Sequence, residues 1–468
     1  MSEADTIGLT RRLAAFVAGA RFEHLSAETV RMTRLSLLDA VGVTLAASSM
    51  GEGVAAFADV ARETGGRPEA AVIGFGFHTS MLGAVIANGA GAHALDYEDA
   101  YDGAPIHPNA ACVPVALAVG QATNASGPAI LTALAVGCDL VCRLGLALGV
   151  NPDDAGWYPP PILSTFGAAA TAANLLGLDA DQTAAALALA LNQATATAQF
   201  KTDPASTLRA VRDAFPAHAG LLAAQLAKRG VRGFDGVFEG RAGLFALFSQ
   251  GRYDATALTD GLGERFHGDR LSFKLWPSCR GTHAFIEAAL TLRTQYRSPD
   301  HIAEIVMTGG AVQRMLVEPQ AQKQAPQTAI DAKFSLPFTT AAALVHGRID
   351  LDSFTRERLT DSDVLGLAAR SRFEVDPTAT IREAAAGRLE LRLRDGRTLS
   401  AHVPHPLGAP QNPADDAGLI AKFLDCAGRS AVALEAGGAV KIAEVLLALD
   451  DVDAPTSVLA SLSGSGQD

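Results

Sequence analysis

Apolar residues recur at helical spacing through the first half of the chain and form shorter runs after about residue 270. From residue 6 to 265, alanine and leucine repeat every three or four positions between glycine and proline breaks, which predicts a series of helices. The clearest helices are expected at residues 129–149, 166–177, 182–195 and 216–229. Because so many interior positions are alanine, we expect the helix axes to approach one another closely.

The later part of the chain predicts strands as well as helices. Residues 302–307 form a short, mostly apolar run of strand length, and residues 372–375 predict a further strand. Residues 389–394 and 397–403 flank Asp395-Gly396, a two-residue turn that is typical of a β-hairpin. Helical stretches separate these runs, at residues 283–296 and 339–346.

This pattern predicts a mainly α fold that consists of a large all-helical domain and a smaller α+β domain. We assign residues 1–267 and 406–460 to the helical domain, and residues 268–405 to an α+β domain inserted before the C-terminal helices. A chain of 468 residues is long for one hydrophobic core, which agrees with two domains. Residues 461–468, rich in glycine and serine, are expected to form a flexible tail.

Composition and charge narrow the classes of partner. Hydrophobic residues make up 49% of the chain and charged residues only 19%, which predicts a large core. The net charge of −12, without a basic stripe, argues against nucleic acid. Residues 103–138 carry no charged side chain, but prolines and polar residues interrupt them, so we expect buried helices and no membrane span. The N-terminus lacks an uninterrupted apolar segment, so we expect no signal peptide and a cytoplasmic protein.

The five cysteines are scattered through apolar segments and are odd in number. This usage predicts reduced, mostly buried thiols, as in a cytoplasmic protein. Cys138 and Cys142 could share a helix face, but no second Cys/His pair near them has metal-ligand spacing. The sequence therefore predicts no metal site and no cofactor.

The densest group of titratable residues lies at positions 93–109, between apolar segments. It contains His93, Asp96 and His107 together with further carboxylates and two tyrosines. Burying such groups without partners costs roughly several kcal/mol each, so a cluster of this kind indicates a function. Asp96 and His107 are the first candidates for proton transfer, with His107 placed just before an apolar helix. The alternative is a solvated acidic loop between two helices.

Four blocks of the chain resemble the MmgE/PrpD family of 2-methylcitrate dehydratases, cis-aconitate decarboxylases and iminodisuccinate epimerases. Residues 93–99 and the His-Pro-Asn at 107–109 are similar to the family's H-x-x-D-[FY]-[DE]-D run and the HPS turn that follows it. Residues 156–169, 274–283 and 332–338 resemble, in the same order, its G-[FW]-H-P…GAA, K-x-[YF]-P-x-C…H and A-x-F-S-[LV]-P-[YF] blocks. The resemblance covers roughly residues 5–450.

The resemblance implies a cofactor-independent enzyme with a helical domain, a smaller lid domain and a homodimeric assembly. It also implies a small polycarboxylate substrate, bound in the cleft between the two domains. The apolar helix at residues 129–149 is either a face of the dimer interface or part of the intramolecular core.

The blocks also assign roles to individual residues. His107 matches the catalytic histidine of the HPS turn, and Asp96 matches the first carboxylate of the acidic run, as a general base or as a group that orients a histidine. His93, three residues earlier, is a potential partner of Asp96 and a substrate-binding candidate. Lys274 precedes Leu-Trp-Pro in an apolar setting, where burial is expected to lower its pKa towards a working value.

Two matched positions differ from the family. Tyr158 stands where the dehydratases and decarboxylases usually have histidine, and it suits one face of a two-base epimerase. Arg209 stands where the family usually has lysine; it can bind a substrate carboxylate through two hydrogen bonds but cannot serve as a base. Arg280 and His283 are candidates for substrate contacts from the second domain, or else exposed helix residues.

Three functions fit these observations. The first is a dehydratase-like, cofactor-independent lyase that acts on a small di- or tricarboxylate by α-proton abstraction and β-elimination. The second is a two-base epimerase or isomerase of a dicarboxylate, with Lys274 and Tyr158 on opposite faces of the substrate. The third is a non-catalytic metabolite-binding paralogue, which predicts loss of the charged residues. Most of those residues are present, which argues against the third function. Asp96, His107 and Lys274 serve both reactions; Tyr158 favours the epimerase, whereas the prevalence of dehydratase-like members in the family favours the lyase, which we place first.

Overall fold

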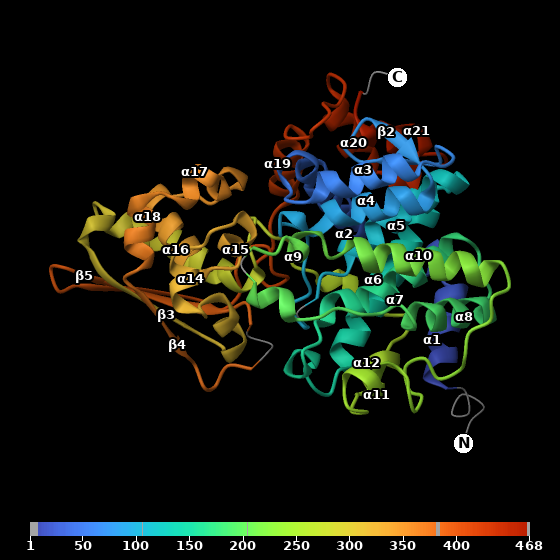
Figure 1. Ribbon diagram of the computed structural model, residues 1–468, viewed down its shortest axis with the longest axis horizontal. Coiled ribbons are helices and arrows are strands. Elements are labelled where there is room, and N and C mark those ends of the chain that lie inside the picture. The colour runs from blue at the N-terminus through green and yellow to red at the C-terminus, as the bar shows by residue number, and fades with distance from the viewer. Residues whose placement is uncertain (1–7, 105, 204, 381–383, 466–468) are drawn as a thin grey trace.

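The computed structural model describes residues 8–104, 106–203, 205–380 and 384–465. Figure 1 shows two parts side by side, a larger helical region and a smaller region in which helices pack on a sheet. The predicted mainly α fold with a smaller α+β region is confirmed. The domain limits at residues 267 and 405 remain predictions.

The helical region begins with twelve helices among the described residues. They are α1 (Leu9–Gly19), α2 (Ala27–Met50), α3 (Val54–Thr64), α4 (Met81–Ala94), α5 (Asn109–Thr123), α6 (Gly127–Ala147), α7 (Pro159–Leu175), α8 (Ala180–Leu191), α9 (Leu208–Val211), α10 (Ala214–Lys228), α11 (Leu244–Phe248) and α12 (Ala255–Thr259). The four clearest predicted helices correspond to α6, α7, α8 and α10, with ends that differ by a few residues.

Short side chains allow the helices of this region to pack closely. At Gly220 on α10, an added Cβ would lie 2.5 Å from the Cβ of Ala168 on α7, so a larger residue would push the two helices apart. The polar Ser26 and Asp179 fix helix starts, because each side chain accepts a hydrogen bond from the backbone N–H three residues later. Local capping and alanine packing together therefore define the scaffold around the loops.

The helical region also contains one feature that the periodicity did not predict. Strands β1 (Ala70–Val72) and β2 (Phe77–Thr79) pair in an antiparallel hairpin, so the expectation of an all-helical domain was wrong in this detail. Each strand has only three residues, which is too short for an alternating pattern to show in the sequence. The side chain of Asn88 on α4 accepts from Ile73 and donates to Ala71, which ties the hairpin to the helices.

The α+β region is built on a four-stranded sheet in the order β4-β3-β5-β6. Its strands are β3 (Ile302–Gly309), β4 (Ser371–Val375), β5 (Gly387–Leu393) and β6 (Thr398–Val403). Strand β3 pairs parallel to β4 and antiparallel to β5, and β5 and β6 form the predicted hairpin. Every second residue of β5 is buried, so one face of the sheet points to the core.

The helices of this region share one core with the buried face of the sheet. They are α13 (His283–Leu292), α14 (Gln320–Gln324), α15 (Ala329–Lys333), α16 (Leu336–His346), α17 (Arg356–Leu359) and α18 (Ser362–Ala368). Helix α13 packs on β5, β6 and α16, which places its apolar residues in the core of this region. The short helix α15 lies near the helical region in Figure 1, where it can reach the loop after α4.

The chain then returns to the helical region. Helices α19 (Asp416–Ala427) and α20 (Gly438–Leu447) pack on α2, and α21 (Thr456–Ala460) packs on α5. Residues 461–463, expected to belong to a flexible tail, instead form a turn in which Leu462 is fully buried. Backbone oxygens of residues 462 and 463 accept hydrogen bonds from Gly74 and Gly76. Residues 466–468 lie outside the described part of the chain.

One helix of the described residues, α6, is long and apolar enough to cross a membrane by length and composition. However, 83% of its most apolar window is buried inside the protein. Its position between α5, α7 and α12 explains the apolar sequence, because all of its faces contact other helices. Of the two roles considered for residues 129–149, core packing is the one that the structure supports.

Candidate active site

The loop between α4 and α5 carries most of the predicted site residues. His93 lies in the last turn of α4, and Asp96 follows with a φ of 50°, a left-handed conformation that is uncommon for a residue with a side chain. A pair of backbone hydrogen bonds between Ala100 and Ser272, of 2.9 and 2.7 Å, aligns this loop with the segment that carries Lys274. Residues 178 positions apart in the sequence therefore meet.

Asp96 and Lys274 form a fully buried ion pair. The Lys274 ammonium donates to Asp96 Oδ1 at 2.6 Å and to the Asp96 carbonyl oxygen at 3.1 Å, and it lies 3.8 Å from Glu98 Oε1. Burial alone would raise the pKa of Asp96, but the Lys274 ammonium lowers it to about 2. Burial would lower the pKa of Lys274, but the two carboxylates raise it. The expected lowering of the Lys274 pKa was therefore wrong, because the sequence did not show both carboxylates beside it.

Glu98 lies between the two histidines of the loop. Its Oε1 atom is 2.5 Å from His93 Nδ1 and 3.0 Å from His107 Nδ1. The histidines and Lys274 outweigh burial and hold the pKa of Glu98 well below its usual range, whereas burial and then Arg212 lower the pKa of His93. The partner of His93 is thus Glu98, and the predicted partner Asp96 lies further away, 3.8 Å from Nε2. Glu98 is an ionised acceptor in the centre of the cluster.

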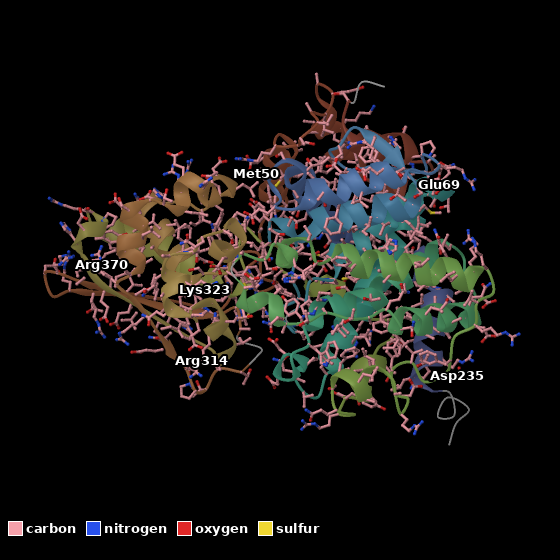
Figure 2. The ribbon with its side chains drawn as sticks, viewed as in Figure 1. Met50, Glu69, Asp235, Arg314, Lys323 and Arg370 are labelled. Carbon is pink, nitrogen blue, oxygen red and sulfur yellow. The ribbon has the colours of Figure 1, made fainter. Side chains whose placement is uncertain are left out.

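A cavity of about 140 Å³ lies in front of this cluster, between the helical and α+β regions. His107 and Tyr158 line it from the helical region, and Cys279, Arg280 and Phe334 line it from the other side. Asp96, Glu98 and Lys274 are fully buried and do not line the cavity. Figure 2 shows that side chains of both regions fill the space where they meet. The arrangement places two proton-transfer candidates at the cavity and an ion pair behind them.

Tyr158 directs its hydroxyl group towards the charged cluster. Arg212 donates to the Tyr158 oxygen at 3.0 Å, and its Nη2 lies 3.4 Å from His93 Nδ1. Burial raises the pKa of Tyr158, although Arg212 and Arg209 oppose the shift. At neutral pH the phenol is therefore protonated and can donate a proton or a hydrogen bond.

Arg209 is a buried cation whose hydrogen-bonding capacity is not filled by the described residues. Its guanidinium lies 3.3 Å from the ring centroid of Phe334, but Nε and Nη2 have no hydrogen-bond partner among the described residues. A buried guanidinium in this state is suited to an anionic ligand. Close by, Lys201 lines the cavity and lies 4.5 Å from the Tyr158 ring centroid, with its ammonium paired to Asp153 at 2.5 Å.

The two candidates from the α+β region have different surroundings. Arg280 lines the cavity, but Asp102 of the helical region already holds its guanidinium, with Nη2–Oδ2 at 3.0 Å. His283 is fully buried, and its Nε2 lies 3.2 Å from the Ser278 carbonyl oxygen. The alternative that both are exposed helix residues was wrong. Whether either contacts the substrate remains a prediction.

The loop also contains enough histidines and carboxylates, close to one another, to be considered as a metal site. Ligand atoms of His93, Asp96, Glu98 and His107 lie within 4.8 Å of one another. However, the Lys274 ammonium, 2.6 Å from Asp96 and 3.8 Å from Glu98, already supplies a positive charge there and would repel a divalent cation. The cluster therefore fits a resident ammonium better than a metal ion.

Sequence reasoning did not single out Glu98, Arg212 or Lys201. Glu98 was part of the recognised acidic run, but the run does not show which carboxylate faces the histidines. Arg212 follows Arg209 by three residues, a spacing that can place both on one side of a short helix. Lys201 is the first basic residue after Arg143, at the end of a long stretch in which the only charged residues are acidic. An isolated cation at this position could have indicated an anion-binding residue.

Two family domains match the chain one after the other. Residues 11–257 match the MmgE/PrpD N-terminal domain, and residues 276–446 match the MmgE/PrpD C-terminal domain. The chain belongs to the MmgE/PrpD family. The two matches include every residue of the cluster except Lys274, which lies two positions before the second match begins.

Similar MmgE/PrpD proteins are enzymes named for cis-aconitate. The chain is 28% identical to the cis-aconitate decarboxylase-like protein oryM of Aspergillus oryzae, over 74% of this chain and 75% of that protein. It is 24% identical to the cis-aconitate decarboxylases of Mus musculus and Homo sapiens, over 96% of this chain and 93% and 94% of those proteins. This protein is accordingly an enzyme of the MmgE/PrpD family, with relatives of the lyase type.

Proposed function

We propose that the protein is a cofactor-independent lyase that removes an α-proton from a small di- or tricarboxylate and then eliminates a β-substituent. The observation that carries the proposal is His107 at the wall of the cavity, backed by the fully buried network of Glu98, Asp96 and Lys274. Burying this many charges lowers the free energy of unfolding, so a dense buried cluster indicates a functional site.

His107 is the proposed base. Its Nδ1 lies 3.0 Å from the Asp99 carbonyl oxygen and 3.0 Å from Glu98 Oε1, so this nitrogen carries the hydrogen. The lone pair is then on Nε2, the nitrogen that remains for the substrate. When His107 accepts the proton, the imidazolium is stabilised by the Glu98 carboxylate beside it. Asp96 is a weaker candidate for the base, because Lys274 lowers its pKa to about 2.

Cations beside the cavity suit a polycarboxylate; Arg209 does not itself line the cavity, but its guanidinium stacks on Phe334, which does. Arg209 has two unfilled donor nitrogens in a buried setting, and its side chain can bind a carboxylate in a bidentate manner. Lys274, with its raised pKa, is an ammonium at neutral pH and adds positive potential behind the reacting carboxylate. These groups would stabilise the additional negative charge that develops when the α-proton leaves.

Tyr158 is the proposed acid. In the elimination, His107 takes the α-proton, the electron pair of the C–H bond forms the C=C bond, and the β C–O bond breaks. The phenol of Tyr158 gives its proton to the departing hydroxyl, which leaves as water. Arg212, which donates to the Tyr158 oxygen, stabilises the phenolate that remains. Transfer of a proton from His107 to Tyr158 through solvent resets the site.

The test is incubation of the purified protein in D₂O with citrate, 2-methylcitrate, cis-aconitate or iminodisuccinate, followed by proton NMR. Loss of a hydroxy acid together with new vinyl signals is the expected result. Loss of carbon dioxide from cis-aconitate would instead assign a decarboxylase. Absence of any reaction or exchange with all four acids would reject the proposal for this class of substrate.

A two-base epimerase is the second candidate, favoured by Tyr158, which lines the cavity together with His107 and can serve as a second proton-transfer group. The raised pKa of Lys274 argues against lysine as its base, so His107 would take that part. Deuterium uptake at a carbon centre without vinyl signals would assign this reaction. Binding of an acid without any exchange would instead support a metabolite-binding protein.

A further inference from the structure

Three buried lysines bind three consecutive backbone carbonyl groups beside the site. The ammonium of Lys333 donates to the Leu95 oxygen at 2.8 Å, and that of Lys274 donates to the Asp96 oxygen at 3.1 Å. The ammonium of Lys422 donates to the Tyr97 oxygen at 2.6 Å. The segment at residues 95–97 thus receives one hydrogen bond per residue from a lysine amino group, from three separate parts of the chain.

Each lysine comes from a different structural unit. Lys333 ends α15 in the α+β region, Lys274 lies in the segment that enters that region, and Lys422 lies on the C-terminal helix α19. Lys333 and Lys422 have 3% and 7% of their surface exposed. Burial lowers the pKa of Lys333 to about 7, and a neutral amine can still donate to a carbonyl oxygen. Neither Lys333 nor Lys422 lines the cavity.

The backbone at this point needs support. Asp96 has a φ of 50°, in the left-handed region where a residue with a Cβ atom is strained. Its amide closes a short turn, in which Asp96 N donates to the His93 oxygen at 2.7 Å. The conformation directs the Asp96 carboxylate to Lys274, so its retention controls the geometry of the ion pair behind His107.

Lys422 binds the backbone of both segments that carry the Asp96–Lys274 ion pair. Its ammonium donates to the carbonyl oxygen of Lys274 at 2.9 Å as well as to Tyr97, and it lies 3.8 Å from the Tyr97 ring centroid. Its counter-ion is Asp39 on α2, at 2.6 Å. One buried ammonium therefore joins the backbone of the acidic loop to the backbone of Lys274.

We propose that Lys333 and Lys422 are positioning residues, which hold residues 95–97 so that the Asp96–Lys274 ion pair stands at a fixed distance behind the reacting groups. The inference deepens the proposed function and rests on it for its catalytic part. Neither lysine touches the substrate, and each acts through the loop. The C-terminal helix α19 is accordingly required for the chemistry as well as for the fold.

The first test measures the loop without any substrate. Hydrogen–deuterium exchange of the full chain, read by mass spectrometry on peptides that cover residues 93–101, is compared between the wild type, Lys422→Met and Lys333→Met. Both substitutions are expected to speed exchange in these peptides. Lys228→Met is the matched control, since Lys228 also donates to a backbone oxygen, that of Leu176 at 3.0 Å, but is exposed and on α10.

The second test separates positioning from stability. Lys422→Met leaves Asp39 as an unpaired buried carboxylate, whereas Lys422→Met combined with Asp39→Asn removes that charge. We expect the double variant to regain most of the lost denaturant midpoint but not the activity. For both, kcat should fall about 100-fold with KM changed less than about threefold, because misplacement of catalytic groups by an ångström has effects of this size.

The outcomes decide the two parts separately. Unchanged exchange at residues 93–101 in both single lysine variants would overturn the proposed support of the loop, whatever the activity. Faster exchange with unchanged kcat, on an acid that the wild type converts, would overturn its catalytic role, and so would recovery of kcat in the double variant. If the wild type converts none of the acids, the proposed function fails while the exchange data still decide whether the lysines hold the loop.

Discussion

The ion pairs of the active-site cluster and those on the sheet of the α+β region each join a carboxylate to a basic side chain, but in opposite surroundings. Asp96 and Lys274 have fully buried side chains. On β3, β4 and β5, Glu304 pairs with Arg372 and Arg392, and the exposed fractions of these side chains are 33%, 38% and 47%. Water solvates the second set and is excluded from the first.

The difference in burial indicates which ion pairs matter for stability and activity. Exposed pairs contribute little to folding because water and salt screen them. A buried pair costs desolvation, and removing one partner leaves a charge without compensation. With only 19% charged residues, the protein nevertheless buries at least three lysines beside one loop. The contrast predicts large effects of substitution in the cluster and small effects on the sheet.

The largest effect is expected for Lys274→Met. It removes the charge that stabilises Asp96 and Glu98, so kcat should fall about 1000-fold and the free energy of unfolding by about 3–5 kcal/mol. Steady-state kinetics and urea denaturation measure the two losses. Lys274→Met with Asp96→Asn should recover stability without activity; a single variant with near-normal kcat would show that the buried pair is not used.

Tyr158→Phe comes next, because it removes the proposed acid but no buried charge. We expect kcat to fall about 100-fold, with folding changed by no more than about 1–2 kcal/mol. Kinetics with the substrate found by NMR measure this effect. Tyr158→His, which restores the usual residue of the family, should retain more activity than Tyr158→Phe; equal loss in both would deny an acid role to this position.

Arg209→Gln should act on binding. The guanidinium has two donor nitrogens without a partner, and loss of its charged contact with a substrate carboxylate should raise KM about 10- to 100-fold with a smaller change in kcat. Calorimetric titration with a non-reacting dicarboxylate provides an independent reading of affinity. Unchanged affinity would place the carboxylate site elsewhere, with Lys201 as the next residue to vary.

The buried cluster should also make stability depend on pH. Burial raises the pKa of Asp99 from 3.8 to about 7, so the folded protein binds a proton that the unfolded chain releases. This contribution is fully present below pH 3.8 and is lost as the pH rises to about 7. Asp99→Asn should remove this pH dependence. As the pH rises from 5 to 8, the urea midpoint of the variant should therefore increase relative to that of the wild type. A constant difference between the two would contradict the raised pKa.

The smallest effect is expected on the sheet. Arg392→Gln removes exposed pairs to Glu304 and Glu390, so the free energy of unfolding should change by less than about 1 kcal/mol and activity should not change. Urea denaturation at low and high salt measures this effect. A loss as large as that of Lys274→Met would remove the distinction between the two regions.

The sequence predicted the parts of the fold that have a clear period. Helices α6, α7, α8 and α10 and the hairpin β5–β6 followed from alternation and turn residues. The hairpin β1–β2 did not, because three-residue strands show no period. Helix lengths were less certain than helix positions: residues 192–195, predicted helical, lie beyond the end of α8.

Within the site, the dense run of titratable residues pointed to Asp96 and His107, and the resemblance to the family's blocks pointed to Lys274. The sequence could not show that two carboxylates lie near Lys274 and reverse the pKa shift expected from burial. Lys422 carried a usable signal, since Leu419, Phe423 and Cys426 place it on the buried stripe of α19. Its contact with a loop more than 300 residues earlier depends on tertiary structure alone.

The most direct test of the account is solvent exchange at the α-carbon. The wild type and His107→Gln are incubated in D₂O with each of the four acids, and deuterium in the recovered acid and product is measured by mass spectrometry and NMR. The account predicts vinyl product with the wild type, with any deuterium in the recovered acid at the α-carbon, and rates of product formation and of exchange at least about 100-fold lower with His107→Gln. Equal rates in the two proteins, or neither product nor exchange with the wild type, would contradict proton abstraction by His107.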